Sequence, residues 1–123
     1  MRIEFTASTV SCYTENDVLT IGVGDDPVSP KNYIIISRLD DGGSVDDSIG
    51  IQTHLSEAEV SDAIKEIYLS LDKLIIKIED RKKDDVHASE IVALLPRDDP
   101  GFDQLKKYVH EIFYGSSVHI NVN

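Results

Sequence analysis

The residues of this chain that offer the most chemistry are the carboxylates between Arg38 and Lys65. That interval has no lysine or arginine, yet it contains seven acidic residues: Asp40, Asp41, Asp46, Asp47, Glu57, Glu59 and Asp62. Grouped carboxylates can hold a metal ion, act as a general acid and base, or attract a cationic partner. The spacing of these residues, and the groups that accompany them, discriminate between the three possibilities.

The segment that starts at Asp40 does not have the spacing of a calcium-binding loop. An EF-hand needs oxygen ligands at positions one, three and five, a glycine at position six and a glutamate at position twelve. Here Gly42 stands at position three and Val45 at position six. Metal-ligand spacing is also missing among the histidines, which are His54, His87, His110 and His119. We therefore expect neither a metal nor another cofactor.

Catalytic signatures are missing as well. General acid–base catalysis by a carboxylate pair requires that burial raise the pKa of one of the two carboxyl groups. Aspartates beside glycines in a loop are instead expected to be solvated. Cys12 and the serines have no nucleophile-elbow context. The Gly22-Val23-Gly24 segment lacks the third glycine of a dinucleotide loop, and Asp25-Asp26 would repel a pyrophosphate. We expect a protein that is not an enzyme.

The charge balance favours a cationic protein partner. The 123 residues carry a formal net charge of −11, most of it in the first half of the chain. Such a surface repels nucleic acid and anionic membranes and attracts basic proteins. A solubilising role for the charge is the alternative.

A single cysteine fits a reducing compartment, and no apolar run approaches the roughly 20 residues of a spanning helix. We therefore expect one soluble, cytoplasmic domain.

The elements that must position the carboxylates are mostly strands. Alternating or continuous apolar residues predict strands at 2–10, 17–24, 33–37, 49–53, 73–78, 90–95 and 118–122. One helix is predicted with Asp99 as N-cap and Pro100 at its first position, ending at Gly115. These elements indicate an α+β fold: a mainly antiparallel, twisted β-sheet with one C-terminal helix packed on it.

Residues 56–71 allow two interpretations. Ser56 and Glu59 have the spacing of a capping box, and Val60 would then begin a helical stripe that includes Tyr68. Alternatively, a short helical turn ends near Asp62 and residues 64–69 form a strand that pairs with 74–78. Periodicity slightly favours the helix.

The order of segments resembles a family of small bacterial immunity proteins. The similarity lies in Tyr33-Ile34-Ile35-Ile36-Ser37-Arg38, the acidic loop, Ile49-Gly50-Ile51, and the two segments 64–70 and 72–78. Members of this family accompany polymorphic toxin systems, including those of contact-dependent growth inhibition. The resemblance implies that 64–69 is a strand. It also implies that the chain binds and neutralises a cognate toxin, such as a nuclease. Because a nuclease needs a positive groove to hold phosphates, we predict the seven carboxylates as the contact region.

A second hypothesis is a structural or regulatory domain that self-associates. The segment 119–122 is predicted to be a strand near the C-terminus, and such a strand can leave an open sheet edge for a homodimer.

Overall fold

The computed structural model describes residues 1–40, 42–56, 58–96 and 101–122. Its strands are β1 (Arg2–Thr6), β2 (Thr9–Glu15), β3 (Val18–Gly24), β4 (Tyr33–Arg38), β5 (Ile49–Thr53), β6 (Val60–Ser61), β7 (Ile64–Leu69), β8 (Lys73–Ile78), β9 (Glu90–Leu94) and β10 (His119–Val122). Its helices are the short η1 (Asp46–Ser48), η2 (Asp80–Lys82) and α1 (Lys83–Val86), and the longer α2 (Phe102–Ile112). Within these ranges, no helix is long and apolar enough to cross a membrane.

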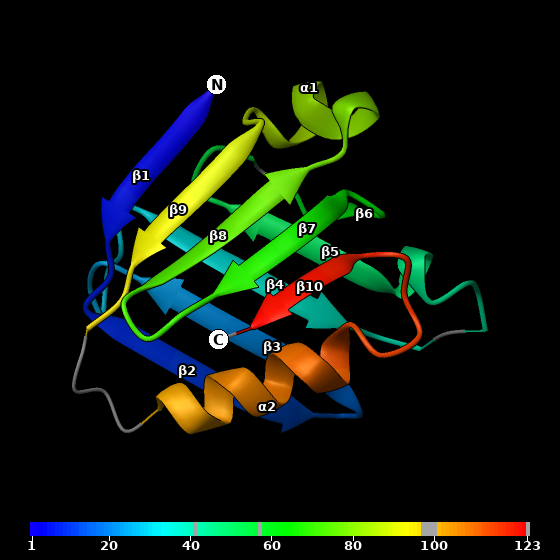
Figure 1. The fold of residues 1–123 in the computed structure, drawn as a ribbon, viewed down its shortest axis with the longest axis horizontal. Coiled ribbons are helices and arrows are strands. Elements are labelled where there is room, and N and C mark those ends of the chain that lie inside the picture. Colours follow the sequence, from blue (N-terminus) through cyan, green and yellow to red (C-terminus); the bar gives the residue numbers. More distant parts are fainter. Residues whose placement is uncertain (41, 57, 97–100, 123) are drawn as a thin grey trace.

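The strands form two sheets stacked face to face (Figure 1). The meander sheet, in the order β2-β3-β4-β5-β6, is antiparallel throughout. The mixed sheet, in the order β1-β9-β8-β7-β10, has antiparallel central pairs, while β1 runs parallel to β9 and β10 runs parallel to β7. The predicted α+β class, mainly antiparallel with one C-terminal helix, is confirmed, and the strands divide between two sheets.

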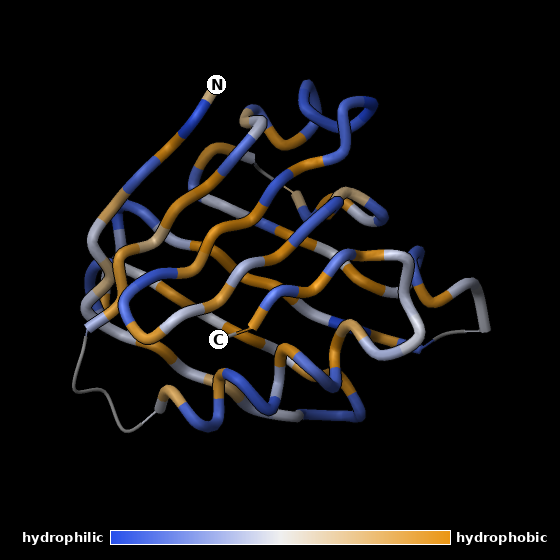
Figure 2. The backbone as a smooth tube through the Cα atoms, in the orientation of Figure 1, coloured by the Kyte–Doolittle hydropathy of each residue, from blue (hydrophilic) through white to orange (hydrophobic). Residues whose placement is uncertain are grey.

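The core lies between the two sheets and beneath α2. Inward-facing residues such as Ile36 and Ile76 alternate with more exposed ones, and Figure 2 shows this alternation along the strands. Leu105, Val109 and Ile112 of α2 belong to the same buried cluster. The helix therefore covers the side of the stack next to β2 and β3, as Figure 1 shows.

The predicted strand 2–10 is two strands, because the chain changes sheet at residues 7 and 8. The amide of Ala7 bonds to Leu94 O of the mixed sheet at 2.8 Å, whereas the amide of Ser8 bonds to Gly24 O of the meander sheet at 2.8 Å. The second strand, β2, then pairs with β3 across Asn16-Asp17. Both turn residues have positive φ, as a two-residue type I′ hairpin requires.

The strand interpretation of residues 64–69 is confirmed. They form β7, which pairs antiparallel with β8. The capping box does not form, because Val60 and Ser61 lie in the extended strand β6 and Ser56 Oγ accepts a bond from Thr53 N at 3.4 Å. Ile67 and Leu69 are buried in the core, and this packing stabilises the strand more than the helical periodicity of the segment favours a helix.

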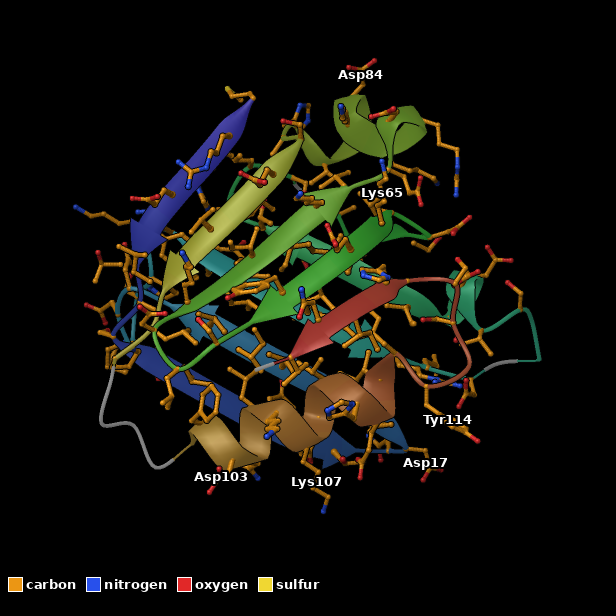
Figure 3. All side chains as sticks on the ribbon, in the orientation of Figure 1. Asp17, Lys65, Asp84, Asp103, Lys107 and Tyr114 are labelled. Atoms are coloured by element: carbon orange, nitrogen blue, oxygen red, sulfur yellow. The ribbon has the colours of Figure 1, made fainter. Side chains whose placement is uncertain are left out.

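The predicted C-terminal helix is present as α2. Its predicted start at Asp99 and Pro100 lies outside the described residues. Gly115 follows the helix with a φ of 80°, a left-handed conformation that favours glycine. Asp103 and Lys107 of α2 extend away from the core into solvent (Figure 3).

Candidate functional site

Five of the seven predicted site residues lie at one end of the meander sheet. Asp40 follows the end of β4, Asp46 and Asp47 lie in η1, and Glu59 and Asp62 flank β6. Since β4, β5 and β6 are neighbours and η1 contacts β6, these residues lie at the same end of the sheet, where β4 ends and β5 begins. We call these five residues the acidic surface. Asp41 and Glu57 lie outside the described residues.

Asp40 is held by Arg38, which also binds the end of α2. Arg38 Nε donates to Asp40 Oδ1 at 3.0 Å, and Nη1 lies 3.0 Å from Ile112 O and 2.7 Å from Tyr114 O. The Arg38 side chain is only 12% exposed. The Tyr114 side chain points into solvent (Figure 3), so Arg38 contacts its main chain. Arg38 thus supplies donors to carbonyls that a helix C-terminus leaves without partners.

Asp46 connects η1 to the segment between α2 and β10. Its Oδ1 accepts a hydrogen bond from Ser117 N at 2.9 Å. Asp46 also lines a small depression together with Asp62 and the apolar residues Ile49, Ala63, Ile64 and Val118. The sequence places Asp46 and Asp62 sixteen positions apart, and the fold brings them to one depression.

Asp62 is paired with a cation from a distant part of the chain. Arg81 Nη2 donates to Asp62 Oδ2 at 2.8 Å and to Asp62 O at 3.2 Å. Asp62 has a φ of 55°, a left-handed conformation that aspartate tolerates better than most residues. Its role in the fold is therefore to shape the connection between β6 and β7.

Glu59 lies over the backbone of β5. Its carboxyl group occupies the space that a Cβ atom on Gly50 would need, and Ser37 Oγ donates to Glu59 Oε2 at 3.3 Å. Gly50 is buried as a result. A Cβ atom at position 50 would therefore displace the exposed Glu59 side chain from its position over β5.

Asp47 is the most available carboxylate of the acidic surface. It is exposed, and no described residue donates a hydrogen bond to its side chain or pairs with it. Its amide is held by Ser44 Oγ at 3.1 Å, so the residue is fixed through its backbone. Asp40, whose side chain is 66% exposed, is the next most available.

The acidic surface is less negative than the sequence indicates. Its five carboxylates are accompanied by the guanidinium groups of Arg38 and Arg81, which leaves a net charge of −3. Sequence reasoning missed both partners because they lie at or beyond the limits of the acidic interval. The position of Arg38 at the end of a predicted strand, directly before the acidic loop, was the sequence feature that could have indicated its pairing with Asp40.

Among the described residues, no three His, Cys, Asp or Glu side chains come together in a way that could hold a metal ion. Four carboxylates of the acidic surface, those of Asp40, Asp46, Glu59 and Asp62, accept hydrogen bonds or ion pairs from the surrounding fold. No protein-family model matches the chain, and no curated protein matches its sequence.

Proposed function

We propose that this protein is a cytoplasmic, non-enzymatic immunity protein that binds and neutralises a cognate bacterial toxin through the acidic surface. The observation that supports this most is the fixed position of the carboxylates. Asp40 is held by Arg38 and Asp46 by the amide of Ser117. Because groups that are already ordered lose little conformational entropy on docking, they bind a partner at a smaller cost than mobile side chains.

A basic toxin surface is the partner that this arrangement fits. Exposed carboxylates on Asp40 and Asp47 accelerate encounter with a positive surface, and this effect weakens as salt screens the charges. A nuclease has such a surface, because it must hold nucleic-acid phosphates. The acidic surface would cover that groove and exclude the substrate.

The test begins with the gene next to the one that encodes this chain. We expect it to encode a large secreted protein with a toxic C-terminal domain. Co-expression of this chain should restore growth to cells that produce the toxic domain, and the two purified proteins should form a complex that salt weakens. Growth arrest in the presence of the well-expressed chain, with no complex at low salt, would refute the proposal.

A further inference from the structure

The outer face of the meander sheet contains a hollow of about 240 Å³ beside the loop of residues 25–32. Its floor is formed by outward positions of β2, β3 and β4, two of which are the glycines Gly22 and Gly24. A Cβ atom on Gly24 would come within 3.2 Å of Pro30 Cβ, so a side chain at this position would take up part of the space. Without side chains at these two positions, the strand surface stays low beside the loop.

The walls of the hollow are largely apolar. Pro27 and Pro30 come from the loop, and Tyr33 and Ile35 come from β4. Ile35 is 36% exposed although it lies within a sheet, so an apolar surface is open to solvent here. A concave site with apolar walls and a few polar groups is typical of a place where another molecule binds.

One carboxylate lines the hollow, and among the described residues no lysine or arginine does. The carboxylate is that of Asp26, an exposed residue whose Oδ1 accepts bonds from the amides of Val28 and Ser29 at 2.8 and 3.1 Å. These neutral donors hold the pKa of Asp26 below its ordinary value of 3.8, so the group is ionised at neutral pH. Lys31 of the same loop does not line the hollow. The hollow therefore carries a net negative charge.

The described residues on the rest of this face add negative charge and no positive charge. The rows of paired residues that include Tyr33, Ile35 and Ser37 cross the meander sheet without a lysine or arginine. Glu59 places its carboxyl group on the face, where it accepts a bond from Ser37 Oγ at 3.3 Å. Ser37 lies about 13 Å from Tyr33 along β4. The face therefore presents a carboxylate near each end of β4, and Glu59 connects it to the acidic surface.

This combination fits the side chain of a lysine or arginine. Both residues bury an aliphatic stem against apolar walls while the cation reaches a polar group, and arginine also matches a carboxylate with two parallel hydrogen bonds. An anionic group would be repelled by Asp26, and a purely apolar group would cover the carboxylate without replacing its water. A second copy of the chain would bring its own net charge of −11 to the contact. Charge complementarity therefore selects a basic partner.

We propose that the hollow beside the 25–32 loop is a binding site for one lysine or arginine side chain of a basic protein partner. The partner is the toxin if the proposed function holds, and this identification rests on that proposal. The toxin would then contact the outer face of the meander sheet as well as the acidic surface, so the interface would extend from Asp47 at one end of the sheet to Asp26 at the other. The chemistry of the hollow belongs to this chain alone and can be measured without the toxin.

Amide chemical shifts test the site with a probe peptide, acetyl-Ala-Arg-Ala-amide, added from about 0.1 to about 20 mM at low salt. We expect saturable shifts at Gly22, Gly24 and Ile35, and much smaller shifts with acetyl-Ala-Glu-Ala-amide. Asp26→Asn keeps an oxygen for the loop amides but removes the charge, and it should weaken binding at least about fivefold. Asp103→Asn is the matched control, because it removes the same charge from the exposed side of α2 (Figure 3).

A second pair of variants acts on the space of the hollow. Ser11→Lys places a cation at an exposed position that lines it, so the arginine peptide should no longer produce the shifts. Leu71→Lys adds the same charge in the exposed β7–β8 turn, where it should leave the shifts unchanged. Circular dichroism checks that each variant is folded.

The absence of saturable shifts at the hollow, or equal peptide affinity in Asp26→Asn and Asp103→Asn, would overturn the inference. The toxin complex gives a second readout, in which Asp26→Asn should raise the dissociation constant more than Asp103→Asn does. Equal dissociation constants in these two variants would also overturn the inference. A toxin that does not bind the wild-type chain at all would instead refute the proposed function, while the peptide titration still decides whether the hollow binds a cation.

Discussion

Arg38 Nη1 donates to the main-chain oxygen of Tyr114 at 2.7 Å, and this bond joins the end of β4 to the end of α2. The same guanidinium group reaches Ile112 O and Asp40 Oδ1. One nearly buried side chain therefore fixes the start of the acidic loop, completes the helix C-terminus and links the meander sheet to α2.

Replacement of Arg38 by alanine should lower the free energy of unfolding by about 2 kcal/mol, because helix carbonyls in a partly buried position lose a charged donor. Urea denaturation measures the change. Arg2→Ala is the control, since Arg2 is exposed and its ion pair with Glu90 should contribute less than about 1 kcal/mol. Equal losses in the two variants would show that Arg38 does not support the helix end.

Gly50→Ala should destabilise the chain by no more than about 1 kcal/mol, because its Cβ atom would displace only the flexible, exposed Glu59 side chain. The displaced Glu59 would also lose its bond from Ser37. In a Glu59→Ala background the same glycine substitution should cost much less, and a double-mutant cycle from thermal denaturation measures this coupling. An additive result would mean that the two residues are independent.

The loop after β3 should show an acid-dependent opening. Hydrogen bonds from the amides of Val28 and Ser29 hold the pKa of Asp26 below its ordinary value of 3.8. Because the folded pKa is lowered, this contribution to stability is present above 3.8 and is lost as the pH falls through the folded pKa. Amide chemical shifts of Val28 and Ser29 should titrate with a midpoint below 3.8. A midpoint at or above 3.8 would contradict the geometry.

Asp47→Lys and Asp62→Lys should differ in their effect on stability. Asp47→Lys should change stability by less than about 0.5 kcal/mol, because the side chain is exposed and pairs with no described residue. Asp62→Lys should cost about 1–2 kcal/mol, because it removes the Arg81 pair and places lysine at a left-handed φ. Thermal unfolding compares the two. Similar losses would show that the Arg81 pair and the backbone conformation contribute little.

Local patterns predict most of the strands in this fold. Residues 73–78 alternate between apolar and polar side chains, and they form β8. Asn16-Asp17 marks a hairpin turn, because asparagine and aspartate tolerate positive φ. Strand alternation and turn residues are local features of the chain, so they can be recognised in one sequence without knowledge of its tertiary contacts.

Long-range pairing was not predictable in the same way. Nothing local indicates that β1 lies beside β9, or that the chain changes sheet between Ala7 and Ser8. The candidate site shows the same limit. Asp40, Asp46 and Asp62 were identified as an acidic group, but their partners Arg38, Ser117 and Arg81 are set by tertiary structure.

The arrangement of the two sheets limits which strand pairs can form while the chain is being synthesised. The meander sheet is built from one continuous segment and can form as soon as β6 is available. The mixed sheet needs both ends of the chain, since Arg2 of β1 and its partner Glu90 of β9 are 88 residues apart. Because domains emerge from the ribosome N-terminus first, β1 remains without its neighbour until most of the chain has been made. The hydrogen-bonding edge of β1 that pairs with β9 therefore stays unpaired until residues 90–94 have been synthesised.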